Sequence, residues 1–318
     1  MSDGKLTPDT MMSASRLPGL MGYSKYSTPN DELSYSVRAL DGQEREPFES
    51  EPADWGNRFE SHILQESMQR LGLDDYNLDH KHPSFADGVP LCCSLDGTAD
   101  GHGRVITTDP DAGIFVIGQD DIVLEGQGVF EAKLTGQDVD DIPPLWRGPI
   151  QLQGQMLVTG AKWGAVCTLY RGTKLRIFLF APHQVTLDSI KGACEDFQAR
   201  LDKYSLTKEI EYYPPHNSQD ANKLWPESDD TEINLDYSAE ILAQEIVESK
   251  AEIKDLQALI EDRETKLKAK LQDAKKGVAG KFRITWPMRH YKAQPERITP
   301  AKEATVIRQS TLTIKEIK

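Results

Sequence analysis

The sequence predicts an α/β protein of the α+β type, with a mixed central β-sheet flanked by helices and a long C-terminal helical extension. Two patterns predict this fold class. Short β-rich runs separated by Gly and Asp occupy residues 91–180, and a helical run at residues 148–161 lies between them. Amphipathic helical patterns stand before and after this region, so helices are expected to cover the sheet.

Composition places the chain among globular proteins. Its 318 residues are 38% hydrophobic, which suffices for one large core or two domains. The net charge of −14 argues against a generally basic, nucleic-acid-coating surface, but it is compatible with a local basic groove. No apolar run approaches the roughly 20 residues that span a bilayer, and the first ten residues lack a signal-peptide pattern. We therefore expect a soluble, cytoplasmic protein without a membrane partner.

The cysteines show neither a CxxC pair nor the even spacing of a secreted disulfide framework. They are Cys92, Cys93, Cys167 and Cys194. Reduced, buried thiols are the expected state.

Before the β-rich region, the spacing predicts a short helix ending near Gly22, a second helix opened by "STPND", and a polar loop over residues 39–53. A stronger amphipathic helix is expected over residues 53–72. Its apolar positions at helical spacing are Trp55, Phe59, Ile63, Leu64, Met68 and Leu71. After the sheet, residues 181–204 predict another helix, and residues 212–230 form a linker rich in Pro, Asn and Asp.

The C-terminal part divides into a helix and a basic tail. Residues 238–276 predict one long helix with Ile246, Ile253 and Ile260 seven residues apart, which favours a helical hairpin arm or a short coiled coil. A helix packed on its own domain is the alternative. Residues 277–318 carry nine Lys or Arg against three Glu. The tail also holds the aromatic residues Phe282, Trp286 and Tyr291. It is expected either to contact DNA or to be a solvated end.

The run "GVFEAKLTG" (residues 128–136) combines a strand pattern with two charges. A strand has period two, so Glu131 and Lys133 share one face while Phe130 and Ala132 share the other. Upstream, "CSLDGTADG" places Asp96 at the end of a β-like run. Carboxylates from two adjacent strands supply the hard oxygen ligands that Mg²⁺ prefers. The simpler alternative is a surface ion pair on a strand.

Lys133 would complete such a site. Its ammonium would lie beside the attacking water and the attacked phosphate, where it lowers the pKa of the water or stabilises the developing charge. Two neighbouring motifs strengthen this interpretation. "WGNRFE" places Glu60 on a helix, and "QLQGQ" places three glutamines on the helix after the strand.

Taken in order, "SAS...GLMGYSKYSTPNDEL", "WGNRFESHI", "SLDGTADG", "GVFEAKLTG" and "QLQGQMLVTG" resemble the YqaJ-like viral recombinase family. This family includes the lambda exonuclease and belongs to the PD-(D/E)xK nuclease superfamily. The resemblance covers residues 11–215 and implies a PD-(D/E)xK nuclease core. Five motifs in order are far more specific than any one of them.

The resemblance implies roles for individual residues. Asp96 and Glu131 correspond to the two metal-binding carboxylates, and the carbonyl of Ala132 is a further ligand. Glu60 resembles the helix glutamate that supports or binds a metal. Lys133 resembles the catalytic lysine.

Further roles follow from the same resemblance. Gln153 corresponds to the glutamine that orients the lysine or the water. Ser13, Ser15 and Arg16 fall where the family contacts DNA near the terminal phosphate, and Gln151 is also expected at the DNA. For the two serines, a plain helix N-cap is the alternative.

The sequence departs from the family pattern in two places. Gly148 stands where the family often has a tyrosine. Between Asp96 and Glu131 lie 34 residues instead of a short hairpin, so a polar, exposed inserted hairpin is expected over about residues 101–127. The insertion makes Asp100 a rival to Asp96.

Other metal-binding residues are less favoured. His80 and His82 precede the catalytic strand, and some related nucleases use an upstream histidine, but loop histidines without a function are expected here. The cysteines do not fit the four-cysteine pattern of the iron–sulfur branch.

The activity that the resemblance implies is a Mg²⁺-dependent DNA exonuclease that digests linear double-stranded DNA from 5′ to 3′ and leaves 3′ single strands for recombination. One or two ions are expected, and Mn²⁺ is expected to substitute. The implied partners are duplex DNA ends, a phage-type single-strand annealing protein, and two further subunits in a ring-shaped trimer. A phage-encoded protein would act in the bacterial host cytoplasm.

The expected domains are a nuclease domain (1–225), a linker with the long helix (226–276) and the basic tail (277–318). Two rival functions remain. One is a PD-(D/E)xK endonuclease for restriction or repair, and the other is a non-catalytic DNA-binding module of the same fold.

Overall fold

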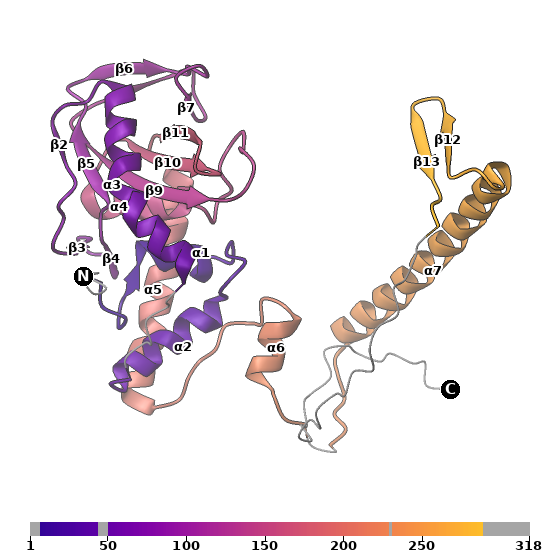
Figure 1. Ribbon diagram of the computed structural model, residues 1–318. Helices are drawn as coiled ribbons and strands as arrows, with labels where there is room; N and C mark the ends of the chain where they lie inside the picture. Colours follow the sequence, from indigo (N-terminus) through magenta and orange to yellow (C-terminus); the bar gives the residue numbers. More distant parts are fainter. Residues whose placement is uncertain (1–6, 44–49, 229–230, 289–318) are drawn as a thin grey trace, which may run out of the picture. The chain divides into compact units, whose positions relative to one another are not determined.

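The computed structural model describes residues 7–43, 50–228 and 231–288 (Figure 1). The chain divides into two compact units, Met1–Ala221 and Asn222–Lys318. The first unit contains the central sheet and is described first. Among the described residues, no helix is long and apolar enough to cross a membrane.

The central sheet of the first unit has six strands and mixed pairing, as predicted. Its order is β2 (Tyr76–Asn77), β5 (Gly97–Asp100), β9 (Gln127–Thr135), β10 (Gly164–Tyr170), β11 (Lys174–Phe180) and β7 (Ile114–Val116). The pairs β9–β10 and β11–β7 are parallel, and the others are antiparallel. Parallel β9 and β10 are joined through helix α4 (Pro149–Thr159), the usual connection between parallel neighbours.

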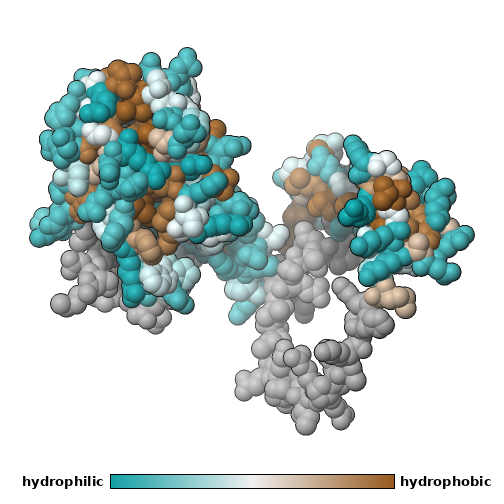
Figure 2. Space-filling model, turned by 45° about the horizontal axis from the view of Figure 1, so that its top comes forward, coloured by the Kyte–Doolittle hydropathy of each residue, from teal (hydrophilic) through white to brown (hydrophobic). Residues whose placement is uncertain are grey.

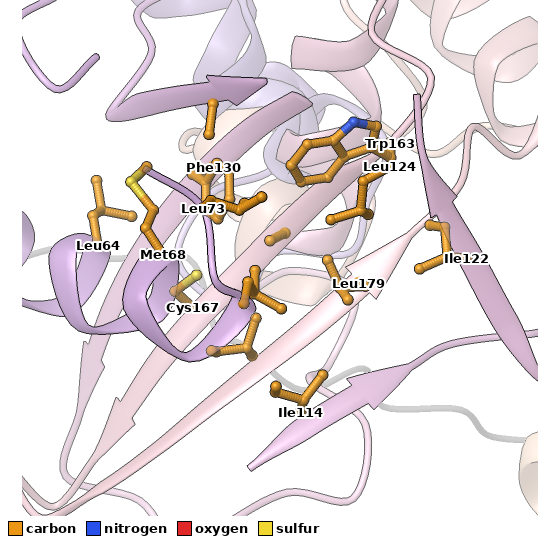
Figure 3. Packing of buried hydrophobic residues seen from close by; sticks show 14 of the residues in the cluster. Leu64, Met68, Leu73, Ile114, Ile122, Leu124, Phe130, Trp163, Cys167 and Leu179 are labelled. Atoms are coloured by element: carbon orange, nitrogen blue, oxygen red, sulfur yellow. The ribbon is translucent and has the colours of Figure 1, made fainter. Parts of the chain in front are cut away.

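Helices cover both faces of this sheet. On one face, α3 (Glu51–Leu71) buries Leu64 and Met68 against Phe130 and Cys167, in the large cluster shown in Figure 3. On the other face, α4 packs its apolar side chains on β9, β10 and β11. That second cluster comprises Val129, Leu152, Met156, Val166, Tyr170 and Phe178, together with Ala161. The alternation of β9 therefore directs Val129 and Phe130 into two different cores.

A third cluster joins the N-terminal segment to the helix after the sheet. It contains β1 (Met12–Ser13), η1 (Ala14–Arg16), α1 (Leu17–Leu20), α2 (Pro29–Leu40) and α5 (Gln184–Thr207). A small sheet of order β1–β4–β3 lies here, with β4 at Leu91–Cys93 and β3 at Ser84–Phe85. Thr28 and Asp31 form a capping box at the start of α2, which confirms the predicted helix start at "STPND".

Helix α3 differs from its predicted amphipathic pattern in one respect. It ends as expected at Gly72, whose φ of 68° is left-handed. However, Trp55 and Phe59 are 44% and 39% exposed instead of joining the core. Their rings pair with each other at a centroid distance of 5.8 Å. The buried residues of α3 all lie between Ile63 and Leu71, so its first half extends beyond the core.

The inserted segment is only partly the polar, exposed hairpin that the sequence predicts. Strands β6 (Arg104–Thr107) and β8 (Asp121–Leu124) do pair antiparallel. The expectation is wrong for the residues between them, because β7 joins the central sheet beside β11. The buried hydrophobic side chains of the insertion are Ile114, Val116, Ile122 and Leu124. They extend the core of the sheet.

Gly148 stands where the family often has a tyrosine, and the backbone there accepts only glycine readily. Its φ is 111°, and a Cβ atom would lie 2.7 Å from Cγ1 of Val166. The chain therefore packs tightly against β10 immediately before α4 begins.

The second unit holds helix α7 (Tyr237–Leu271) and the hairpin of β12 (Lys276–Ala279) with β13 (Phe282–Thr285). The long helix was predicted, but it ends at Leu271 rather than at residue 276. The hairpin begins at Lys276, the last residue of the predicted helix, and otherwise lies within the predicted basic tail. A further helix, α6 (Ser218–Leu224), interrupts the predicted linker. Tyr291 and the rest of the tail from residue 289 lie outside the described residues. All four cysteines are buried, and none of them forms a disulfide among the described residues, in agreement with the expected thiols.

Candidate active site

The register of β5 and β9 brings Asp96 next to the E-x-K strand. Gly97 pairs with Phe130 in this antiparallel ladder, and Asp96 directly precedes Gly97. The backbone N–H of Ala132 donates to Oδ2 of Asp96 at 2.9 Å. Asp96 and Glu131, which are 35 positions apart in the sequence, thus lie side by side at one end of this strand pair.

The two charges of β9 share one face, as the strand period predicts, and α4 lies over that face. Nζ of Lys133 donates to Oε1 of Glu131 at 2.5 Å. Glu131 is only 2% exposed, while Lys133 is half-buried. Phe130 and Ala132 point to the opposite face and join the large cluster. This pair is therefore not the surface ion pair that was the simpler alternative.

Two glutamines of α4 complete the contacts of Glu131. Nε2 of Gln151 donates to Oε2 of Glu131 at 2.7 Å, and Oε1 of Gln151 accepts from Nζ of Lys133 at 3.1 Å. Nε2 of Gln155 also donates to Oε2 of Glu131 at 2.7 Å. Residues four apart lie on one face of a helix, so this contact needs the first and third glutamine of "QLQGQ".

Gln153, to which the resemblance assigned the orienting role, lies elsewhere. Its Nε2 donates to the carbonyl of Ala181 at 3.0 Å, and its Oε1 accepts from the backbone N–H of His183 at 2.9 Å. Two positions along a helix turn a side chain by about 200°, so Gln153 and Gln151 point in nearly opposite directions. In this structure Gln153 therefore holds the start of α5 and does not contact Lys133, so its orienting role stays a prediction.

Gln155 received no assignment from the sequence. The signal that could have found it is the spacing of four from Gln151, which places both amides on one helix face. Gln155 is fully buried, and its Oε1 has no hydrogen-bond partner among the described residues.

Glu60 contributes a third carboxylate from α3. It is half-buried. Burial and the nearby charge of Glu131 raise the pKa of Glu60, while Lys133 opposes this shift. Residues 63 and 64 of the next turn are buried against the sheet, which fixes the direction of this part of the helix.

The neighbouring carboxylates also shift the pKa values of Asp96 and Lys133. Burial, followed by the charges of Glu131 and Glu60, raises the pKa of Asp96 well above its usual range. Burial alone would lower the pKa of Lys133, but the carboxylates of Glu131 and Asp96 outweigh it and raise that pKa. Lys133 is therefore the cation that these carboxylates share.

The donor set has the chemistry of a divalent-cation site. Within the part of the chain that the structure describes, no three His, Cys, Asp or Glu side chains converge as a complete metal centre. Two carboxylates, Asp96 and Glu131, flank Ala132 directly, and Glu60 lies within electrostatic reach. Burial first, and then the charges of Glu131 and Glu60, raise the pKa of Asp96, and a cation bound between these carboxylates would offset that cost. Hard oxygen ligands of this kind suit Mg²⁺ or Mn²⁺.

Arg16, which was expected at the DNA, is paired inside the protein, and its DNA contact stays a prediction. Arg16 is 6% exposed, and its guanidinium forms an ion pair with Glu32 at 2.7 Å. Its remaining N–H groups donate to oxygens of residues 9, 11, 32 and 36. All of its donors are used inside the protein, so Arg16 fixes the N-terminal segment to α2.

The two serines beside Arg16 differ in exposure. Ser13 is buried in β1 and Ser15 is exposed, and their hydroxyl oxygens lie 3.2 Å apart. Ser13 makes no side-chain cap to the following turn, which contradicts the N-cap alternative for this residue. A DNA contact by Ser15 is still a prediction.

The rivals for metal binding lie away from the carboxylate pair. Asp100 pairs with Gln127 at the far end of the β5–β9 ladder, and its Oδ1 accepts from the backbone N–H of His102 at 2.8 Å. His80 contacts the hydroxyl of Thr98 at 3.3 Å, and His82 is exposed. Asp100 therefore lies away from Glu131 and Lys133, and the metal-binding role of Asp96 stays a prediction.

The motifs and the order of these elements agree with a known family. Residues 8–162 match the sequence model of the YqaJ-like viral recombinase domain. These residues form a YqaJ-like viral recombinase domain. The match contains every carboxylate of the site, Lys133 and both contacting glutamines. Among curated proteins, no sequence is significantly similar to the chain.

Several solved structures are similar to this chain. An alkaline exonuclease from Laribacter hongkongensis is 15% identical, with a TM-score of 0.44, over 69% of this chain and 96% of that one. Its complex with dAMP gives 14% identity and a TM-score of 0.45, over 68% and 95%. A phage-related exonuclease from Haemophilus somnus 129PT is 11% identical, with a TM-score of 0.40, over 63% and 96%. Because these scores lie below 0.5, we base the proposed function on the site and its motifs.

Proposed function

We propose that the YqaJ-like domain is a divalent-metal-dependent DNA exonuclease. The observation that carries this proposal is the convergence of Asp96, Glu131 and Lys133 on adjacent strands. Hydrolysis of a phosphodiester needs a Lewis acid at the phosphate, an aligned water and a cation for the developing charge. The residues present supply ligands for the first and a cation for the last.

Asp96 and Glu131, with the carbonyl of Ala132, would hold the ion, and Glu60 would support it or bind a second one. A bound Mg²⁺ supplies Lewis acidity at the phosphoryl oxygen and favours deprotonation of water at neutral pH. Lys133 stays protonated because carboxylates raise its pKa, so it donates to the phosphate or the attacking water and does not act as a base. Gln151 orients Lys133 and Glu131 by bonding to both.

The finer features of the proposal come from the motif resemblance. They are digestion from 5′ to 3′ on linear double-stranded DNA, production of 3′ single strands for an annealing protein, and a ring of three subunits. An enclosed channel would reconcile a net charge of −14 with DNA binding, because cations need only line the channel.

The decisive experiment compares three DNA substrates in Mg²⁺. Linear duplexes labelled at the 5′ end, with a 5′-phosphate or a 5′-hydroxyl, are incubated beside a covalently closed circle. We expect release of the label from linear DNA and an intact circle. Rapid linearisation of the circle would instead support the endonuclease alternative. Loss of linear DNA that persists in Lys133→Ala would show that the assigned site is not the catalytic one.

The non-catalytic alternative predicts DNA binding without turnover. It is tested with the same substrates by measuring whether Mg²⁺ stimulates loss of linear duplex by the wild-type chain. Binding without any turnover would contradict the nuclease proposal.

A further inference from the structure

Helix α7 carries an apolar face that the nuclease proposal does not use. The helix has 35 residues, and none of them is buried in the part of the chain that the structure describes. Its exposed large apolar side chains are Ile241, Leu242, Ile246, Val247, Ile253, Leu256, Leu259, Ile260 and Leu267. Figure 2 shows hydrophobic residues among polar ones on the surface of this unit. A helix of this length with so much exposed apolar surface is typical of an interaction site.

The apolar residues follow the seven-residue repeat of a coiled coil. One position of the heptad is occupied by Ile246, Ile253, Ile260 and Leu267, which are seven residues apart. We call it the first of the two seam positions, the positions that face a partner helix. Leu242 and Leu256 occupy the second seam position, together with Ser249, Arg263 and Lys270. A seam of this kind is buried when two helices pair along their length.

The charges of α7 are divided unevenly between its halves. Residues 237–255 contain five acidic and two basic side chains, whereas residues 256–271 contain three acidic and four basic ones. The charged residues directly before the first seam positions change sign in the same way. They are Glu245 and Glu252 in the first half of the helix and Lys266 in the second half. One half of the helix is therefore complementary to the other half.

This division selects the direction in which two copies would pair. In a parallel pair, Arg263 would face Arg263 and Lys270 would face Lys270 inside the seam, and the two acidic halves would lie together. In an antiparallel pair, each basic half lies along an acidic half, and first seam positions face second ones. Like charges then no longer oppose each other across the seam.

We propose that α7 pairs antiparallel with α7 of a second copy of this chain. The interface is isologous, because each helix contributes the same face. Pairing buries the apolar seam and joins two nuclease units. This proposal does not depend on nuclease activity, since it concerns a helix in the other unit.

The first test is the mass of the full chain by sedimentation equilibrium. Ile260→Asp places a charge in the seam, so we expect association through α7 to weaken by at least about 100-fold. The mass should fall by half, from two joined rings to one where the proposed ring of three forms, and from two chains to one where it does not. Val247→Asp is the matched control, because Val247 is also exposed but lies outside the seam positions. The helix content of both variants is checked by circular dichroism. An unchanged mass in Ile260→Asp, or the same loss in Val247→Asp, would refute the pairing.

The second test addresses direction. Glu245→Lys with Glu252→Lys makes both halves basic, and Lys266→Glu with Lys270→Glu makes both halves acidic, so each double variant should dissociate. All four changes together exchange the charges of the two halves and should restore the pairing of α7 and the mass of the wild-type chain. A parallel pair cannot be restored in this way, so a four-change variant that stays dissociated would overturn the antiparallel arrangement. If another protein or residues 289–318 cover the seam, Ile260→Asp leaves the mass unchanged, which also overturns the proposal.

Discussion

Three side-chain donors hold the carboxylate of Glu131. They determine its orientation, which its position in the motif does not specify. Lys133 donates to one carboxylate oxygen, while Gln151 and Gln155 donate to the other. Charge-assisted hydrogen bonds of this kind are short and directional. They fix the carboxylate in one orientation beside Asp96, which is what a ligand to a hard cation requires.

Removal of either carboxylate to which we assign the proposed metal ion is expected to stop cleavage. We predict that Asp96→Ala and Glu131→Ala each reduce kcat by at least about 10³-fold in Mg²⁺, because they delete ligands that no other side chain replaces. DNA binding, measured by fluorescence anisotropy in Ca²⁺, should stay largely intact since no phosphate-binding cation is lost. Near-normal turnover by either variant would show that the site is misassigned.

The glutamines of α4 provide a matched pair. Gln151→Ala removes a hydrogen bond to Lys133 and one to Glu131, so kcat should fall by about 10- to 100-fold with little change in stability. Gln153→Ala leaves the Ala181 carbonyl and the His183 amide without their partner. It should lower the free energy of unfolding by about 1–3 kcal/mol while kcat of the folded enzyme is retained. The opposite pattern would return the orienting role to Gln153.

Sequence alone could not choose among these glutamines. "QLQGQ" offers three amides, and helical spacing divides them into one pair and one single residue. Which group faces β9 depends on how α4 packs its apolar side chains on the sheet. That packing involves Val166 and Phe178, which come later in the chain.

Strand β9 is positioned by close packing at one of its two bounding glycines. A Cβ atom at Gly128 would overlap the indole ring of Trp163, whereas a Cβ atom at Gly136 would meet nothing within 4 Å. Gly128→Ala is therefore expected to cost about 1–3 kcal/mol of unfolding free energy, and Gly136→Ala less than 1 kcal/mol. Urea unfolding of both variants measures this difference. Equal effects would mean that the contact with Trp163 does not position β9.

At the level of elements, most helices and strands could be predicted from the sequence. For some of them, which side chains are buried could not be predicted. The periodicity of α3 correctly predicts its amphipathic character and its end at Gly72. It also suggests that Trp55 and Phe59 belong to the core, yet the core ends one turn later. Periodicity defines a face of a helix. How many turns of that face are buried depends on how far the partner sheet extends along the helix.

The whole nuclease unit is expected to end after α6. Asp220 accepts hydrogen bonds from Thr28 and Asn30, at 3.0 and 2.9 Å, and it is 1% exposed. We propose that a chain of residues 1–225 folds and cleaves linear DNA. A chain ending at residue 215 lacks Asp220 and should melt several degrees lower. Thermal unfolding of both truncations tests this boundary. A 1–225 chain that does not fold would refute it.

The reactivity of the four cysteine thiols tests whether the whole fold is intact. Burial raises the pKa of Cys93, Cys167 and Cys194 to about 12, and the thiolate is the reactive form. At pH 8 these thiols stay protonated and covered, so reaction with a thiol reagent should follow unfolding. We expect all four cysteines to react quickly in denaturant and none to react quickly in the native protein. Fast labelling of a native cysteine would contradict its burial.

Local sequence determined the alternation of β9, the caps of α2 and α3, the order of the motifs and the heptad repeat of α7. These features depend on neighbours within a few residues, so the chain carries them wherever it folds. Only the tertiary structure decided that Gln155 donates to Glu131, that Arg16 pairs with Glu32 inside the protein, and that β7 pairs with β11 in the central sheet. Each of these outcomes depends on contacts between segments that lie far apart in the sequence.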